Sequence, residues 1–185
     1  MTVERVIITG SSGLVGAYLS HTLKNRFQLF GIDKMHGKNT ALVQNIENPD
    51  VVKNFDSKLD YIVIHCAAAR FDYGIVADDY FHENVNSTRA FLKSLEMLNV
   101  KQFIHVSSVA ALDGEVIEYF DGLGCDDAYR ATKYLQQCEV IDWCRRNKVP
   151  WDVVMPSAIY DDAPRGDTNI GKLQTITRFF PVLPK

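Results

Sequence analysis

VIITGSSGLVG, residues 6–16, joins an apolar, β-branched run to a glycine-rich turn and then to the start of a helical pattern. A turn between a strand and a helix presents unpaired backbone N–H groups and the positive end of the helix to an anion such as a pyrophosphate. Gly10 would allow the tight turn, Gly13 the approach of the phosphates and Gly16 the close packing of the helix. An ordinary glycine-rich loop is the alternative, so the remaining motifs must distinguish the two.

Strand patterns and helical patterns alternate along the chain. The expected strands are residues 3–9, 28–33, 41–46, 61–67, 102–107 and 151–156. The expected helices are residues 14–25, 78–98 and 128–147, with a short one at 49–55 that Asn48 is placed to cap. Such alternation, with strands that are apolar at their centres, predicts an α/β fold with a doubly wound parallel sheet. Ligands of these sheets bind at the carboxyl ends of the strands.

Asp33 closes the second expected strand. An acidic side chain about twenty residues after the glycine turn accepts hydrogen bonds from the ribose hydroxyls of a bound dinucleotide. Its charge would repel a 2′-phosphate, so NAD is the favoured cofactor. Lys34 and Lys38 lie just beyond and could bind a phosphate, which keeps NADP as the less favoured alternative. For Asp33 itself the alternative is a solvated carboxylate at a strand end.

Tyr129 and Lys133 lie four residues apart in an expected helix, which places both side chains on one face. The pKa of tyrosine is ordinarily near 10, and an ammonium within about 4 to 6 Å favours the phenolate. The pair would then be a general acid and base for an alcohol or a carbonyl. Ser108, at the end of the fifth strand, is placed to orient the reacting oxygen, with Ser107 as the alternative. For the Tyr129 and Lys133 spacing taken by itself, an exposed i, i+4 pair is the alternative, and Ser108 favours the catalytic interpretation.

The segments TGSSGLVG, IVIHCAAA, ENVNSTRAFL, IHVSS and YRATK, together with Asp33, resemble the extended short-chain dehydrogenase/reductase family over about residues 3–160. Over residues 80–108 the chain is similar to its sugar-nucleotide epimerase branch, that of UDP-galactose 4-epimerase. The resemblance implies an NAD(P)-binding Rossmann fold with Ser108, Tyr129 and Lys133 as the catalytic residues. It also implies cofactor contacts from Gly10, Ser12, Gly13, Leu14, Gly16, Asp33, Asn45, Ile46, Ala67, Ala68, Ala69, Asn84, Tyr129, Lys133 and Pro156.

The chain departs from the family pattern at several positions. Asn45 stands where the family has Asp, and Ser87 replaces the glycine of N-V-x-G-T. Residues 109–110 are Val-Ala instead of the Asp-Glu of the dehydratases, which disfavours dehydration. Residues 111–114 do not end in the "VYG" of many epimerases, which leaves simple alcohol/ketone oxidoreduction equally open.

We therefore expect an NAD-dependent oxidoreductase or epimerase that acts on a sugar nucleotide or a similar hydroxy/keto substrate. Its chemistry would be proton relay through Tyr, Lys and Ser with hydride transfer to the nicotinamide. The alternative is a non-catalytic NAD(P)-binding sensor or interaction module that has kept the fold.

The composition limits the partners. The 185 residues carry a net charge of −3 and are 46% hydrophobic. Without a cluster of Lys and Arg, we expect neither a nucleic acid nor a membrane surface as a partner. No apolar run approaches the roughly 20 residues that span a bilayer, and the N-terminus lacks the pattern of a signal peptide, so a cytoplasmic protein is expected.

The cysteines have no metal-ligand spacing and are expected to be structural thiols, with no metal site. His65 and His105 lie in expected strands and are assigned to packing rather than to catalysis.

Residues 1–160 are expected to form the dinucleotide-binding Rossmann domain. After Pro156 the alternation stops, and residues 161–185 are interpreted as the start of a substrate-binding portion or as a linker, with one helix predicted at 170–180. Because extended members of the family carry a C-terminal portion that closes over the substrate, we expect the chain to be truncated before it.

A homodimer is expected from the resemblance, with contacts through the helices at 78–98 and 128–147. Apolar residues on these helices, such as Tyr134 and Trp143, could equally belong to the core.

Overall fold

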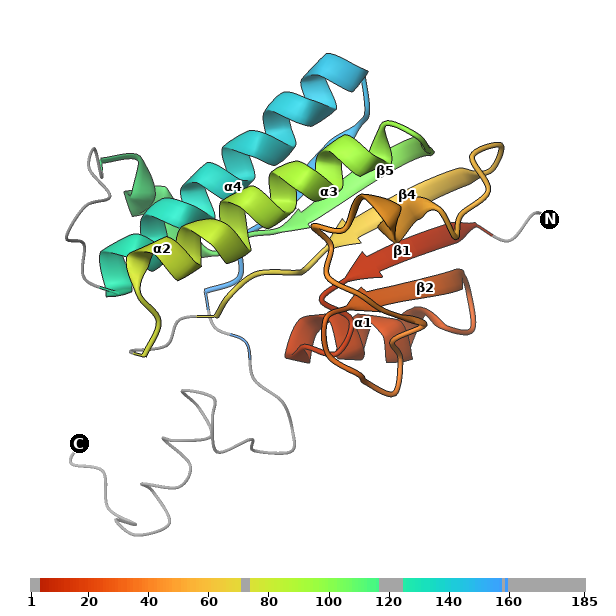
Figure 1. Ribbon diagram of the computed structural model, residues 1–185, viewed down its shortest axis with the longest axis horizontal. Coiled ribbons are helices and arrows are strands. Elements are labelled where there is room, and N and C mark those ends of the chain that lie inside the picture. The colour runs from red at the N-terminus through yellow and green to blue at the C-terminus, as the bar shows by residue number, and fades with distance from the viewer. Residues whose placement is uncertain (1–3, 71–73, 117–124, 158, 160–185) are drawn as a thin grey trace, which may run out of the picture.

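A parallel sheet runs through the middle of the molecule (Figure 1). The computed structural model describes residues 4–70, 74–116, 125–157 and 159. Its strands are β1 (Arg5–Thr9), β2 (Gln28–Asp33), β3 (Leu42–Val43), β4 (Asp60–His65), β5 (Asn99–Val106) and β6 (Trp151–Val154). Within the described residues they form one sheet in the order β3-β2-β1-β4-β5-β6, and each neighbouring pair is parallel. The doubly wound α/β sheet expected from the sequence is confirmed.

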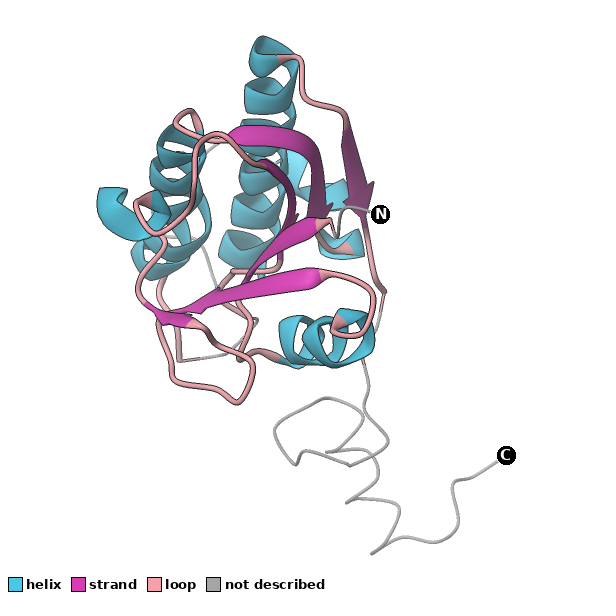
Figure 2. Cartoon of the chain, turned by 90° about the vertical axis from the view of Figure 1, so that its right-hand side faces the viewer, coloured by secondary structure: helices cyan, strands magenta, loops and turns pink. Residues whose placement is uncertain are grey.

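Helices cover both faces of this sheet. The longer ones are α1 (Leu14–Leu23), α3 (Ser87–Leu95) and α4 (Cys125–Asn147), and the shorter ones are η1 (Pro49–Val52), α2 (Ala77–Tyr80), η2 (Phe81–Asn86) and η3 (Val109–Val116). Figures 1 and 2 show α1 on one face and α3 beside α4 on the other. The connections after β1 and β4 thus leave to opposite faces, which makes the carboxyl ends of these two strands the switch point of the sheet.

The alternation of side chains along β1 divides the core between the two faces. Val6 and Ile8 are buried in the cluster that packs against α1. Ile7, between them, is buried in the larger cluster together with Trp143 of α4. Full burial of one such aliphatic side chain contributes about 1.5–3 kcal/mol. Trp143 therefore belongs to the core and is not an outward residue of a dimer face.

The strand expected at 41–46 is shorter in the structure. β3 pairs only with the last two residues of β2. Just beyond it, the side-chain oxygen of Asn45 accepts the backbone N–H of Glu47 at 3.2 Å, and a turn of this kind bends the chain away from the sheet. Asn48 then caps η1 as expected, accepting the backbone N–H of Asp50 at 2.9 Å.

Two further segments differ from the expectation. The long helix expected at 78–98 is interrupted by the π-helical turn of η2. The stretch at 114–127, expected as a loop, begins within η3 and ends within α4. The middle of that stretch lies outside the described residues, as do residues 161–185 and the helix expected at 170–180.

The glycine turn packs closely against the loop after β4 and against the first turn of α1. Gly10 has a φ of +68°, in the left-handed region that favours glycine, and a Cβ there would lie 2.9 Å from the backbone nitrogen of Ala67. A Cβ on Gly16 would lie only 2.2 Å from the carbonyl oxygen of Gly10. The first turn of α1 therefore rests directly on the backbone of the loop that precedes it.

Substitution of Gly16 by alanine is expected to destabilise the fold by about 1–3 kcal/mol, since the added methyl group collides with backbone that cannot easily move. Helix propensity alone would favour alanine by about 1 kcal/mol, so the sign of the change tests the contact. Gly13→Ala is the comparison variant, since its Cβ would approach the same Gly10 oxygen only to 3.2 Å and its loss of stability should be smaller. Urea unfolding measures both, and a stabilised Gly16→Ala variant would contradict the packing described.

Candidate cofactor and active site

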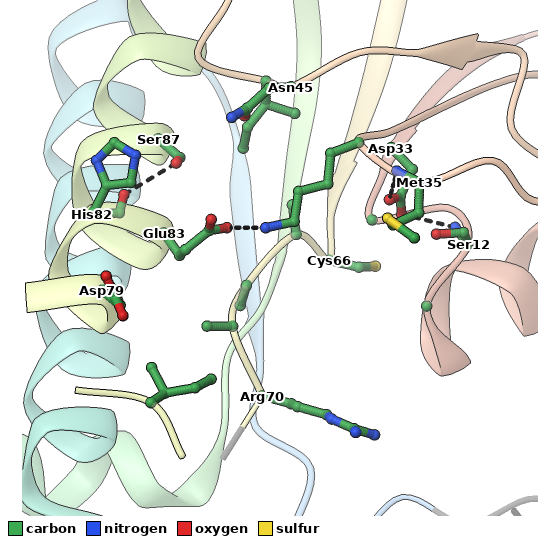
Figure 3. Close-up of a pocket in the computed structure, with 18 residues that line it drawn as sticks. Ser12, Asp33, Met35, Asn45, Cys66, Arg70, Asp79, His82, Glu83 and Ser87 are labelled. Atoms are coloured by element: carbon green, nitrogen blue, oxygen red, sulfur yellow. Dashed lines mark hydrogen bonds and ion pairs between the residues drawn. The ribbon is translucent and has the colours of Figure 1, made fainter. Parts of the chain in front are cut away.

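A cavity of about 600 Å³ lies at the carboxyl ends of β1, β2 and β4 (Figure 3). It occupies the switch point of the sheet, where the fold class places its ligands. Most of the cofactor residues expected from the sequence line it: Gly10, Ser12, Gly13, Asp33, Asn45, Ile46, Ala67, Ala68 and Ala69. The structure therefore brings together residues that are up to 59 positions apart in the chain.

Asp33 forms part of one wall of this cavity. Its Oδ2 accepts the backbone N–H of Ser12 at 2.9 Å, and its Oδ1 accepts that of Met35 at 2.8 Å. Only 9% of Asp33 is exposed, so it is not a solvated carboxylate. These two bonds fix the carboxylate beside the glycine turn, as Figure 3 shows.

Glu47, which the sequence analysis did not single out, organises the far end of the cavity. Its Oε1 accepts a hydrogen bond from the Ser87 hydroxyl at 3.0 Å and lies 3.3 Å from His82 Nε2. Its Oε2 accepts the side-chain N–H of Asn45 at 3.3 Å. Ser87, the residue that replaces the family's glycine, thus fastens the loop after β3 to the helices of the opposite wall.

Asn84 is fully buried behind the cavity instead of lining it. Its Oδ1 accepts the backbone N–H of Ala69 at 2.7 Å, and its Nδ2 donates to Thr132 Oγ1 at 3.0 Å. The π-helical turn that carries Asn84 is a geometry that often occurs at functional sites. Asn84 therefore holds the loop after β4 against α4 and so shapes the cavity from behind.

Gln136 is the centre of a second buried set of hydrogen bonds. Its Nε2 donates to the Ala67 carbonyl at 3.0 Å and to Thr88 Oγ1 at 2.9 Å, and its Oε1 accepts from Lys133 Nζ at 2.5 Å. Lys133 Nζ also donates to the carbonyl of Val106 at 3.3 Å. The separation of three residues between Lys133 and Gln136 on a helix was the one signal in the sequence that could have indicated this contact.

His65 is buried within the same network. Its Nδ1 lies 2.7 Å from Thr9 Oγ1, and its Nε2 lies 3.0 Å from Thr88 Oγ1. Burial, and secondarily the charge of Lys133, lowers the pKa of His65 to about 3, so the ring is neutral. It stacks on Phe91 with the ring centres 5.7 Å apart. The assignment of His65 to packing is confirmed.

Tyr129 is half-buried and forms a side-chain hydrogen bond with Ser108. Burial raises the pKa of Tyr129 above its ordinary value, and the hydrogen bond with Ser108 acts in the opposite direction. Because the net shift is upward, Tyr129 keeps its phenolic proton at neutral pH. Lys133, one turn further along α4, donates to Gln136 and to Val106, and its effect on Tyr129 stays a prediction.

The two adjacent serines differ in their surroundings. Ser107 is buried, and its hydroxyl has no hydrogen-bond partner within the described residues. Ser108 is half-buried, and its Oγ accepts the backbone N–H of Ala110 at 3.2 Å in addition to its bond with Tyr129. Of the two, Ser108 is the serine that the structure places against the tyrosine.

Three further residues that were expected to contact the cofactor lie outside the lining of the cavity. Leu14 begins α1 and Gly16 packs beneath the turn, while the carbonyl of Pro156 accepts the backbone N–H of Val109 at 3.3 Å. Among the described residues, these three do not line the cavity, nor do Ser108, Tyr129 and Lys133.

The chemistry of the other groups gives little support for a metal or a reactive thiol. Burial raises the pKa of the Cys66 and Cys144 thiols to about 12, which suits structural cysteines. In the part of the chain that the structure describes, His, Cys, Asp and Glu side chains form no group of three or more that could hold a metal ion. Nor does any helix there have both the length and the apolar character needed to cross a bilayer.

Solved structures and a curated relative resemble the chain. The fold superposes on UDP-glucuronic acid 4-epimerase from Bacillus cereus in complex with NAD, with a TM-score of 0.73 and 18% identity over 95% of this chain and 63% of that one. It superposes equally on UDP-galactose 4-epimerase, with a TM-score of 0.75 and 17% identity over 97% and 64%. At these identities the likeness shows the fold alone.

In sequence, the chain is 26% identical over 164 residues to a decarboxylating sterol-4-alpha-carboxylate 3-dehydrogenase of Schizosaccharomyces pombe, covering 77% of this chain and 46% of that protein. The chain thus spans less than two thirds of the length of each of these relatives. The family model described as the NAD dependent epimerase/dehydratase family matches residues 6–178. That match covers nearly the whole chain and agrees with the resemblance of the motifs, so the chain belongs to the NAD dependent epimerase/dehydratase family.

Proposed function

We propose that the chain binds NAD as the dinucleotide-binding part of an oxidoreductase or epimerase for a sugar nucleotide or a similar hydroxy/keto substrate. The observation that carries this proposal is the cavity at the switch point, which has the glycine turn and Asp33 in one wall. Residues 1–160 would form the dinucleotide-binding domain. Residues 161–185 would begin the substrate-binding portion or form a linker.

The residues present fit a dinucleotide. The backbone at Gly10 and Gly13 carries no side chain, and alanines at 67–69 keep the opposite side of the cavity open. The volume of about 600 Å³ lies within the range of small-molecule sites. Each oxygen of Asp33 accepts one backbone N–H and keeps a second lone pair that can accept a ribose hydroxyl.

Tyr129 and Ser108 would carry the proton transfer. When bound, NAD supplies a nicotinamide that accepts or donates a hydride. Tyr129 holds its proton on Oη at neutral pH, so it is suited to protonate a carbonyl oxygen, and Ser108 is placed to hydrogen-bond the same oxygen. For the reverse direction Tyr129 must first lose its proton, which its hydrogen bond with Ser108 favours.

Lys133 would be a buried cationic group behind the cavity. Burial lowers its pKa to about 8, and the electrostatic interaction with Cys66 acts in the opposite direction. At neutral pH Lys133 is therefore mostly the ammonium, which donates to Gln136 and to Val106, and it can release a proton within the pH range of enzymes. The observation that favours the second candidate, a non-catalytic NAD(P)-binding module, is that Ser108, Tyr129 and Lys133 do not line the cavity.

Replacement of Asp33 by asparagine is expected to weaken NAD binding about 10- to 100-fold, because hydrogen bonds to a charged acceptor contribute about 1.5–3 kcal/mol. Titration calorimetry measures the affinity. Asp142→Asn, on the exposed surface of α4, is the control and should leave the affinity unchanged. Equal NAD affinities in all three proteins would exclude Asp33 as a cofactor contact.

Replacement of Tyr129 by phenylalanine is expected to lower turnover by a factor of about 10² to 10⁴, the usual contribution of a positioned acid or base. NAD binding should stay within about 3-fold of the parent, since Phe keeps the ring and loses only the hydroxyl. The measurement is conversion of a panel of sugar nucleotides, sterols and ketones by the full-length protein. Retained turnover would rule out Tyr129 as the proton donor, and a parent protein that binds NAD but converts nothing would support the non-catalytic module.

The buried Lys133 should leave a pH signature on stability. Its folded pKa of about 8 lies below its unfolded value, so the unfolded state binds more protons between about pH 8 and pH 10.4. The cost of burying the charge is therefore full below pH 8 and disappears as the pH rises to about 10.4.

The stability of Lys133→Met minus that of the parent should thus fall by about 3 kcal/mol between pH 7 and pH 10.4, as a shift of two to three pKa units implies. Denaturant unfolding at several pH values measures the difference, and the cysteine titrations largely cancel because the pKa of Cys66, about 12 with Lys133 present, rises further without it and so stays above this range. Lys93→Met, on the exposed face of α3, is the surface control. A difference that does not change with pH would show that Lys133 is not buried as a charge.

A further inference from the structure

One ion pair joins the two walls of the cavity. Lys34, directly after Asp33, places its Nζ 2.7 Å from Oε2 of Glu83 in η2, and both residues line the cavity. Their side chains are 53% and 33% exposed, so the pair lies at the mouth of the cavity and not in the interior. Figure 3 marks this contact with the dashed line that ends on Glu83.

Lys34 is the cation nearest in sequence to the carboxylate that would hold the adenosine ribose. A phosphate on the 2′-oxygen of that ribose carries close to two negative charges and needs a Lys or Arg to bind it. Asp33 does not pair with Lys34, since its two oxygens accept the backbone N–H groups of Ser12 and Met35. The carboxylate that engages Lys34 comes instead from 49 residues further along the chain.

We propose that Glu83 is a cofactor-specificity residue: through its ion pair with Lys34 it withholds the lysine from a 2′-phosphate, so that a nucleotide with a free 2′-hydroxyl is accepted and a 2′-phosphorylated one is rejected. This inference rests on the proposed NAD-binding function and deepens it. Asp33 and Glu83 then act together, because one excludes the phosphate by its own charge and the other removes the cation that would compensate it.

The magnitude follows from two contributions. Breaking an exposed ion pair by itself costs no more than about 5-fold in an equilibrium constant. The Glu83 charge adds a like-charge repulsion of the phosphate, and specificity commonly depends on such a repulsive element as much as on new contacts. We therefore expect loss of the Glu83 charge to improve binding of the 2′-phosphorylated cofactor about 10-fold.

The test is a double-mutant cycle with Glu83→Gln and Lys34→Gln, in which calorimetry gives the dissociation constants of NAD and NADP for each protein. Glu83→Gln should bind NADP about 10-fold more tightly than the parent and NAD within about 3-fold. In the Lys34→Gln background, Glu83→Gln should improve NADP binding by less than about 3-fold, because the lysine that Glu83 would release is then missing. Coupling of this kind between the two residues is what the cycle isolates.

Asp78→Asn is the matched control, since it removes a neighbouring exposed carboxylate that does not line the cavity. If Asp78→Asn raised the NADP affinity as much as Glu83→Gln does, the inference would be overturned in favour of a general charge effect. The same would hold if the full gain from Glu83→Gln persisted in the Lys34→Gln background. A parent protein that binds NAD and whose NADP affinity does not respond to Glu83→Gln would overturn the inference alone. A parent protein that binds neither nucleotide would overturn the proposed function as well.

Discussion

The absence of space for a side chain at Gly10 and Gly16 is the constraint on which the rest of the site depends. The end of β1, the start of α1 and the loop after β4 meet there as bare backbone, with no side chain between them. That contact sets how closely α1 approaches the sheet and where the alanines at 67–69 lie. The cavity lies in front of this contact, with Gly10 and Gly13 in its wall.

Behind the cavity, hydrogen bonds between buried polar side chains hold the elements together, as apolar packing does elsewhere in the core. Gln136 connects α4 to the loop after β4 and, through Thr88, to α3, while Asn84 connects that loop to α4 a second time. Fully satisfied networks of this kind hold one arrangement, since any alternative leaves a buried donor or acceptor unpaired. The Lys133 ammonium is tolerated in the interior because Gln136 of this network and the carbonyl of Val106 in β5 accept hydrogen bonds from it.

Much of the architecture could be predicted from local patterns, because strands, helices and caps depend on residues close together in the chain. The bounds of β2, the cap at Asn48 and the gathering of Asp33 with the glycine turn follow from such patterns. The distant partners could not be predicted, since the contacts of Glu47 with Ser87, of Gln136 with Ala67 and of Glu83 with Lys34 join segments that only the folded sheet brings together. The protonation of Tyr129 was also beyond the sequence, because it depends on burial and on the hydrogen bond with Ser108.

The two walls of the cavity come from separate parts of the chain, the segment through β3 on one side and the helices after β4 on the other. Pairing of β1 with β4 is what brings them face to face. A molecule that touches both walls binds only when both halves of the sheet are assembled, so it stabilises the folded state by mass action and couples the two halves to each other. A ligand in the site would link the two halves of the sheet, and unfolding would then be more cooperative than with the strand pairing alone.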